Sequence, residues 1–252
     1  MTPTSVGILV FICVFGGAML GMWLRTILPK NHLDPESRDT VKVGIGLIAT
    51  MTALVLGLVT ASAKSSFESV NAAVKQTSIN ILTLDRVLAR YGPETGEIRK
   101  TMQQVLRARI EKVWPESSSG PVHLEPAKAG LTAEDLADPI RALDARTDAQ
   151  RALRSRALDL LETIMQARWF VFVGSESVPG PFLAVLLFWL TITFTSFGLY
   201  APRNTTVLAV LFVCAASVSS ALFLVLELDG PFEGLIKTSP EPLRFALAHI
   251  NQ

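Results

Sequence analysis

The sequence predicts an all-α membrane protein: four transmembrane helices, two plus two, with a helical soluble domain inserted between the second and third spans. Three observations predict it. The 252 residues have a mean hydropathy of +0.41 and only 18% are charged, against about 25% in soluble globular chains. The apolar residues are concentrated in four stretches, and a long charged region separates the second stretch from the third.

The four apolar stretches cover residues 6–27, 43–63, 182–200 and 205–226, and Arg25 is their only charged residue. At 1.5 Å rise per residue, about 20 residues cross the roughly 30 Å hydrocarbon layer. Backbone groups in lipid must be hydrogen-bonded within the segment, so all four stretches should be helices. The first stretch has no Lys or Arg before it and no small-x-small cleavage site, which favours a retained span over a signal peptide.

These stretches divide the chain into four parts. Residues 1–63 hold transmembrane helices 1 and 2, and residues 180–228 hold helices 3 and 4, which form a hairpin around 201–204. Residues 64–179 mix both signs of charge and are rich in Ala, Leu, Arg and Glu, all good helix formers. They therefore form the helical soluble domain, and residues 229–252 are expected to be a tail that packs on it.

The second span continues without a helix breaker into the soluble domain. Beyond Phe67, positions at alternating spacings of three and four form a heptad stripe, which is typical of a packed helix. Gly92-Pro93 then ends the helix, so one helix is predicted from Val43 to Tyr91. Thr147 and Gln150 have the spacing of a capping box at the start of a later helix. The stripe consists of Val70, Val74, Thr77, Ile81, Leu84, Leu88 and Tyr91.

Composition excludes several classes of function. Two cysteines, Cys13 and Cys214, rule out a disulfide scaffold and a multi-cysteine metal site. A net charge of +1 leaves no global basic field for nucleic acid. No constellation of nucleophile, base and metal is visible, so no enzyme, cofactor or metal is predicted. The spans contain no internal Asp, Glu, Lys or His, which argues against a proton relay or an ion-pair transporter site.

Two regions of the sequence resemble a known family. The run Val55-Leu56-Gly57-Leu58 followed by Val59-Thr60 is similar to the neck segment of bestrophins. The runs at 228–236 (LDGPFEGLI) and 239–244 (SPEPLR) are similar to the closing motif of the bacterial and plant bestrophin-like domains. The order of elements agrees with both groups. The resemblance to the bestrophin-like group covers essentially the whole chain.

The resemblance implies a pentameric channel for small anions such as chloride, in which the second transmembrane helix of each subunit lines the pore. The family's neck consists of three apolar side chains spaced by four, the last of them Phe. The matching positions in this sequence are Thr50, Leu54 and Leu58. The first side chain therefore carries a hydroxyl instead of being apolar, and none of the three is aromatic. Leu54 and Leu58 could form a dewetting constriction, while the hydroxyls of Thr50 and Thr60 could ease partial dehydration of an ion.

The resemblance also implies a place in the cell (inner) membrane with the soluble domain in the cytoplasm. Lys and Arg near the span ends are equally divided between the two sides, so the positive-inside rule gives no orientation by itself. The partners expected are therefore the lipid bilayer, further copies of the chain and small inorganic anions, with no nucleic acid.

Other interpretations remain open. The stripe of Thr50, Leu54 and Leu58 could be ordinary helix packing, and the pore could pass cations. The chain could instead be a non-conducting membrane scaffold whose heptad face at 67–91 binds a partner. The pattern Gly17-x-x-x-Gly21 is either a helix contact or a coincidence of composition.

Two charged clusters also allow two interpretations each. Glu227, Asp229 and Glu233 resemble the acidic calcium-binding cluster of animal bestrophins, but Asp229-Gly230-Pro231 is equally typical of a turn that ends a helix. The second cluster is either a solvated helix face balanced by nearby aspartates or a positive vestibule that favours anions. It consists of Arg141, Arg146, Arg151, Arg154 and Arg156.

Overall fold

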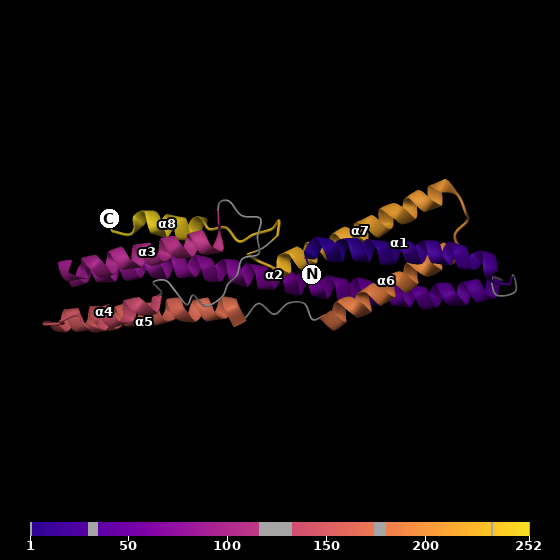
Figure 1. The fold of residues 1–252 in the computed structure, drawn as a ribbon. Coiled ribbons are helices and arrows are strands. Elements are labelled where there is room, and N and C mark those ends of the chain that lie inside the picture. The colour runs from indigo at the N-terminus through magenta and orange to yellow at the C-terminus, as the bar shows by residue number, and fades with distance from the viewer. Residues whose placement is uncertain (1, 30–34, 116–132, 174–179, 233, 252) are drawn as a thin grey trace. The chain divides into compact units, whose positions relative to one another are not determined.

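A computed structural model describes residues 2–29, 35–115, 133–173, 180–232 and 234–251 of the chain, with the backbone alone at 35–38, 133–134 and 168–173. Every regular element in these residues is helical (Figure 1). Four helices are long and apolar enough to cross a membrane, as the sequence predicted. They are α1 (Pro3–Ile27), the first part of α2 (Pro35–Tyr91), α6 (Gly180–Tyr200) and α7 (Thr205–Asp229).

The chain divides into two compact units. Unit 1 comprises Met1–Ser66 and Glu176–Asp229, and unit 2 comprises Phe67–Ser175 and Gly230–Gln252. Unit 1 therefore holds α1, the first part of α2, α6 and α7. Unit 2 holds the second part of α2, the four helices α3 (Gly96–Val113), α4 (Ala137–Arg141), α5 (Asp148–Val173) and α8 (Glu241–His249), and two 3-10 turns, η2 (Pro93–Thr95) and η3 (Ala133–Leu136).

The closest backbone packing in unit 1 is between α1 and α6, and α1 also packs against α7. Glycines allow this approach, since a Cβ on Gly21 would overlap the carbonyl oxygen of Thr195 and one on Gly198 would overlap that of Ala18. Small residues at such contacts let helix backbones pack closely in lipid. The pattern Gly17-x-x-x-Gly21 is thus a helix contact, which confirms the first of its two interpretations.

The core of unit 1 is built from one face of each of its helices. Val14 and Leu186 are fully buried in it, beside Phe194 of α6 and Ala215 of α7. Val59 and Ala63 of α2 belong to the same cluster. The start of α7 is capped by Asn204, whose side-chain oxygen accepts a hydrogen bond from the Val207 N–H at 2.8 Å.

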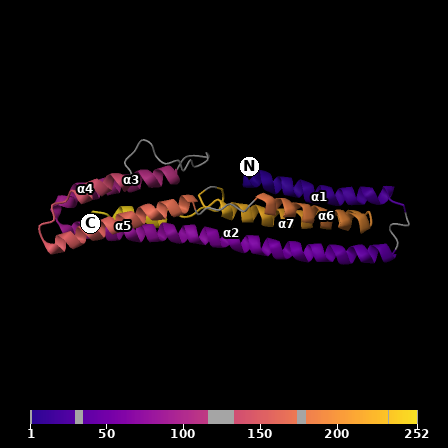
Figure 2. The ribbon, with the colours of Figure 1, turned by 90° about the horizontal axis from the view of Figure 1, so that it is seen from below.

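The second helix is one continuous element of 57 residues, about 85 Å long at the helical rise (Figure 2). It begins at Pro35, earlier than the predicted Val43. Proline is tolerated in the first turn, where its missing N–H would have no helical partner. The predicted end at Tyr91 is confirmed. Gly92 follows with φ of 147°, a backbone conformation that L side chains rarely adopt.

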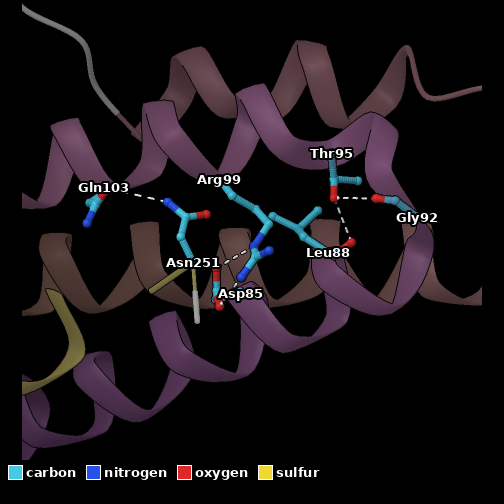
Figure 3. Close-up of polar contacts among 7 residues, drawn as sticks. All are labelled: Asp85, Leu88, Gly92, Thr95, Arg99, Gln103 and Asn251. Atoms are coloured by element: carbon cyan, nitrogen blue, oxygen red, sulfur yellow. Dashed lines mark hydrogen bonds and ion pairs between the residues drawn. The ribbon is translucent and has the colours of Figure 1, made fainter. Parts of the chain in front are cut away.

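The heptad stripe of α2 is buried inside unit 2, except for the half-buried Thr77. Leu84 and Leu88 are each 1% exposed, and they pack in one cluster with Met102 of α3 and Leu161 of α5. Thr95 seals the end of α2, since its hydroxyl lies 2.7 Å from the Leu88 carbonyl and 2.9 Å from that of Gly92 (Figure 3). Such side chains satisfy the carbonyls that a helix end leaves unpaired.

The predicted capping box at the start of α5 is confirmed. The Thr147 hydroxyl accepts a hydrogen bond from the Gln150 N–H at 3.1 Å, and the Gln150 side-chain oxygen accepts one from the Thr147 N–H at 3.3 Å. The two residues satisfy each other's backbone donors, which fixes the first turn of the helix.

The C-terminal segment packs on α2 and α3 within unit 2. The Trp114 indole donates a hydrogen bond to the Thr238 carbonyl at 2.8 Å, and its ring meets Phe232 edge-on at 5.7 Å. The Ser78 hydroxyl donates to the Pro242 carbonyl. Leu243, Ala246 and Ile250 complete the core of the unit, so the tail is part of its hydrophobic cluster.

Candidate pore-lining face of the second helix

In unit 1, one side of α2 packs against the neighbouring helices. Thr52 is 5% exposed, and Val59 and Ala63 lie in the core shared with α1, α6 and α7. The Thr52 hydroxyl donates to the Ile48 carbonyl at 2.7 Å, so its burial leaves no unpaired donor. This side of α2 is completed within a single chain.

The three predicted pore positions lie on the other side of α2. Thr50 is exposed, and Leu54 and Leu58 are 66% and 63% exposed. Positions four apart advance by only about 40° around a helix, so the three side chains form one stripe. Val43 and Leu47 extend it towards the start of the helix as further exposed apolar side chains, and Met51 lies exposed beside it. The single chain leaves this face uncovered.

The hydroxyls near the stripe are oriented by the helix itself. Thr50 donates to the Gly46 carbonyl at 2.8 Å, and Thr60 donates to the Leu56 carbonyl at 2.7 Å. A hydroxyl has one proton, so each oxygen offers only acceptor lone pairs to its other neighbours. In this orientation the two threonines suit a cation, and they must rotate to donate to an anion.

The part of α2 within unit 2 has an exposed basic side. Lys75, Arg86 and Arg90 are exposed, with Ile79 between them at 55% exposure. No residue of the described part of the chain forms an ion pair with these three cations. They leave a net positive charge on this side of the helix, which attracts anions.

Most of the clustered arginines before and along α5 are bonded locally. Arg141 pairs with Asp138 and Arg146 with Asp144, each at 3.0 Å, and both pairs are exposed. The hydrogen bond that Arg146 donates to the Asp144 carboxylate raises the pKa of Arg146. Arg151 pairs with Asp148, and Arg154 donates to the Leu143 carbonyl at 2.9 Å. This is the arrangement expected of a solvated helix face.

Sequence reasoning missed a buried ion pair between α2 and α3. Arg99, 16% exposed, meets Asp85, 1% exposed, through two bonds of 2.7 and 2.9 Å (Figure 3). The bond to Asp85 raises the pKa of Arg99. The only signal in the sequence was an aspartate beside the heptad stripe, because its partner lies 14 positions away across the turn between the helices.

The structure describes two of the three acidic residues that the sequence suggested as a calcium site. Glu227 is buried and Asp229 is half-buried in the last turn of α7, while Glu233 lies outside the described residues. The described part of the chain holds no group of three His, Cys, Asp or Glu side chains suited to a metal ion. The calcium site therefore stays a prediction.

The chain has four long apolar helices, of which α1 and α6 pack through glycine contacts, and a second helical unit with a conventional core. These features define a helical integral membrane protein. The sequence matches the profile of the Bestrophin-like domain over residues 12–243, and the chain belongs to that family. Membership relates it to channel proteins more than to enzymes. No curated protein and no solved structure matches it.

Proposed function

We propose that the chain assembles into a pentameric anion channel in the inner membrane, with the exposed face of α2 from each copy turned towards a common axis. The single observation that carries the proposal is the uncovered stripe of Thr50, Leu54 and Leu58 opposite a fully packed side of the same helix. In an assembly of this kind Leu54 and Leu58 form an apolar constriction that gates by dewetting.

The basic side of α2 in unit 2 supports anions as the conducted species. Lys75, Arg86 and Arg90 raise the local concentration of anions wherever they face a common vestibule. The family relationship supports the same choice and a cytoplasmic position for unit 2.

Cation conduction is the second candidate, and one observation favours it. The Thr50 and Thr60 hydroxyls are bound to their own helix, so they offer lone pairs to an ion. The non-conducting scaffold has less support, because the heptad face that it needed for a partner is buried in the chain's own core.

The deciding experiment is a planar-bilayer recording of the purified full chain under a salt gradient. A reversal potential near the chloride potential supports the anion channel, and one near the cation potential supports the second candidate. Replacing Leu54 and Leu58 together by Ala removes the apolar constriction, and we expect a severalfold higher conductance because a wider, less apolar neck stays wet.

The matched control is Leu224→Ala, which removes the same atoms from an exposed position on α7 and should leave conductance unchanged. Equal conductance in the double variant and wild type would contradict the pore assignment. Silence from folded, oligomeric protein would contradict constitutive conduction and favour the scaffold.

A further inference from the structure

Unit 1 contains a cavity of about 560 Å³ between the start of α2, the end of α6 and the start of α7. Its wall is almost wholly apolar and includes Ile45, Gly46, Ala49, Phe197, Val207 and Val210. This volume lies within the roughly 300–1,000 Å³ typical of small-molecule sites. The cavity differs from the stripe of Leu54 and Leu58, neither of which lines it.

Among the described residues, three cations lie at this end of unit 1. Lys42 lines the cavity together with Ala201 and Pro202, and Arg203 follows directly in the same turn. Arg203 donates to the Met22 carbonyl at 2.7 Å, and Arg25 donates to the Ala201 carbonyl. The first bond holds the guanidinium of Arg203 near the end of α1, and the second holds that of Arg25 at the turn. Neither bond neutralises the charge.

The local charge is positive. Lys42 pairs with Asp39 at 3.1 Å, but both side chains are more than half exposed, and exposed pairs are weak. Among the described side chains at this end, this one carboxylate is set against the cations of Lys42, Arg25 and Arg203. The cavity thus joins an apolar wall to one lining cation, Lys42, and Arg203 follows directly after the two turn residues that line it.

This combination fits an amphipathic anion. A free inorganic anion would bind the cations but would gain nothing from the apolar wall. An apolar helix of a second copy would cover the wall but would leave the cations without a partner anion. Basic pockets between transmembrane helices are known to receive acidic lipid headgroups. We propose that the cavity binds one anionic phospholipid, with its phosphate at Lys42 and Arg203 and an acyl chain against Gly46, Ala49 and Val210.

The proposed lipid site also explains why Lys42 and Arg203 lie at this end of unit 1, which the positive-inside rule does not explain. With unit 2 in the cytoplasm, as proposed above, Lys42 and Arg203 belong to the opposite membrane face, where that rule disfavours them. Binding of lipid phosphate accounts for their presence there. The site itself requires only that unit 1 lies in a membrane and is independent of conduction.

The test compares lipid retention by the full chain in native mass spectrometry, with phosphatidylglycerol and phosphatidylcholine supplied in equal amounts. We expect wild type to retain phosphatidylglycerol with about tenfold preference. The double variant Lys42→Gln with Arg203→Gln should lose most of that preference. Lys75→Gln with Arg86→Gln, which removes two exposed cations from unit 2, should keep it.

A second variant tests the acyl-chain part of the site. Gly46 lines the cavity and a Cβ on it meets no atom within 4 Å, so Gly46→Leu adds its side chain at the cavity wall. It should lower retention of both lipids severalfold while circular dichroism and gel filtration stay as in wild type. Millimolar inorganic phosphate should not displace the lipid, because it gains nothing from the apolar wall.

Several results would overturn the proposal: no preference in wild type, equal loss in the unit 2 control, or full retention in Gly46→Leu. Loss of the oligomer in Gly46→Leu, with no lipid retained by wild type, would assign the cavity to a second copy instead. If the double variant fails to fold, Lys42→Gln and Arg203→Gln are tested singly. A silent channel that keeps the lipid preference would refute conduction and leave this site standing.

Discussion

In unit 1, α2 exposes Leu54 and buries Thr52, whereas in unit 2 the same helix buries Leu88 and exposes Lys75. The second pattern is that of a helix in water, whose apolar face is covered by its own chain. The first pattern is complete only when lipid or further copies cover the apolar face, since lipid removes the penalty on exposed hydrocarbon. The difference shows that the apolar face of α2 is covered by the chain itself in unit 2. In unit 1, an apolar face of α2 stays uncovered and needs lipid or further copies of the chain to cover it.

The largest loss of stability should come from breaking the ion pair between Asp85 and Arg99 inside unit 2. Asp85→Ala leaves the partly buried Arg99 without its carboxylate, and removing one partner of a buried pair typically costs about 3–5 kcal/mol of unfolding free energy. Chemical denaturation of the full chain in detergent, followed by circular dichroism, measures the loss. Lys100→Ala is the control, because its pair with Glu97 is exposed. A loss no greater than that of the control would show that the pair has little effect on stability.

A matched pair of substitutions on α2 tests the comparison directly. Leu88→Ala removes a side chain that is 1% exposed and should cost about 2–5 kcal/mol. Leu54→Ala removes the same atoms from an exposed position and should change stability by about 0.5 kcal/mol or less. Both values come from the same denaturation experiment. Equal losses would mean that Leu54 is covered as thoroughly in the assembled protein as Leu88 is in the chain.

The smallest effect should come from the capping box of α5. Thr147→Ala removes the acceptor for the Gln150 N–H and should cost about 1 kcal/mol. Thr147→Ser keeps the hydroxyl and should recover most of the loss, since serine is an equally good cap. The thermal midpoints of the two variants measure the difference. A serine variant as unstable as the alanine variant would exclude the cap as the cause.

The features that could be predicted from the sequence are those set by local periodicity. The four spans, the unbroken run of α2 to Tyr91 and the capping box at Thr147 each depend on residues close in sequence. The stripe of Thr50, Leu54 and Leu58 could be placed on one helix face for the same reason. The exposure of this stripe could not be predicted, because it depends on which side of α2 the other helices occupy.

The features that could not be predicted depend on packing between distant segments. The pair of Asp85 and Arg99 forms only because α3 folds back along α2. The apolar cavity of unit 1 needs the start of α2 beside the turn between α6 and α7. The spacing of residues along one helix does not indicate which distant segment will pack against it. The sequence pointed to the Gly17 and Gly21 contact but not to its partner helix, α6.

The continuity of α2 has a consequence for hydrogen exchange. A helix leaves its first four N–H groups and last four carbonyls without helical partners. Had one helix ended near Ala63 and another begun near Lys64, frayed amides would lie where the apolar run gives way to charge. Because α2 is unbroken from Pro35 to Tyr91, the amides at that change of environment are bonded within the helix. Their protons exchange with solvent only when the middle of the helix opens.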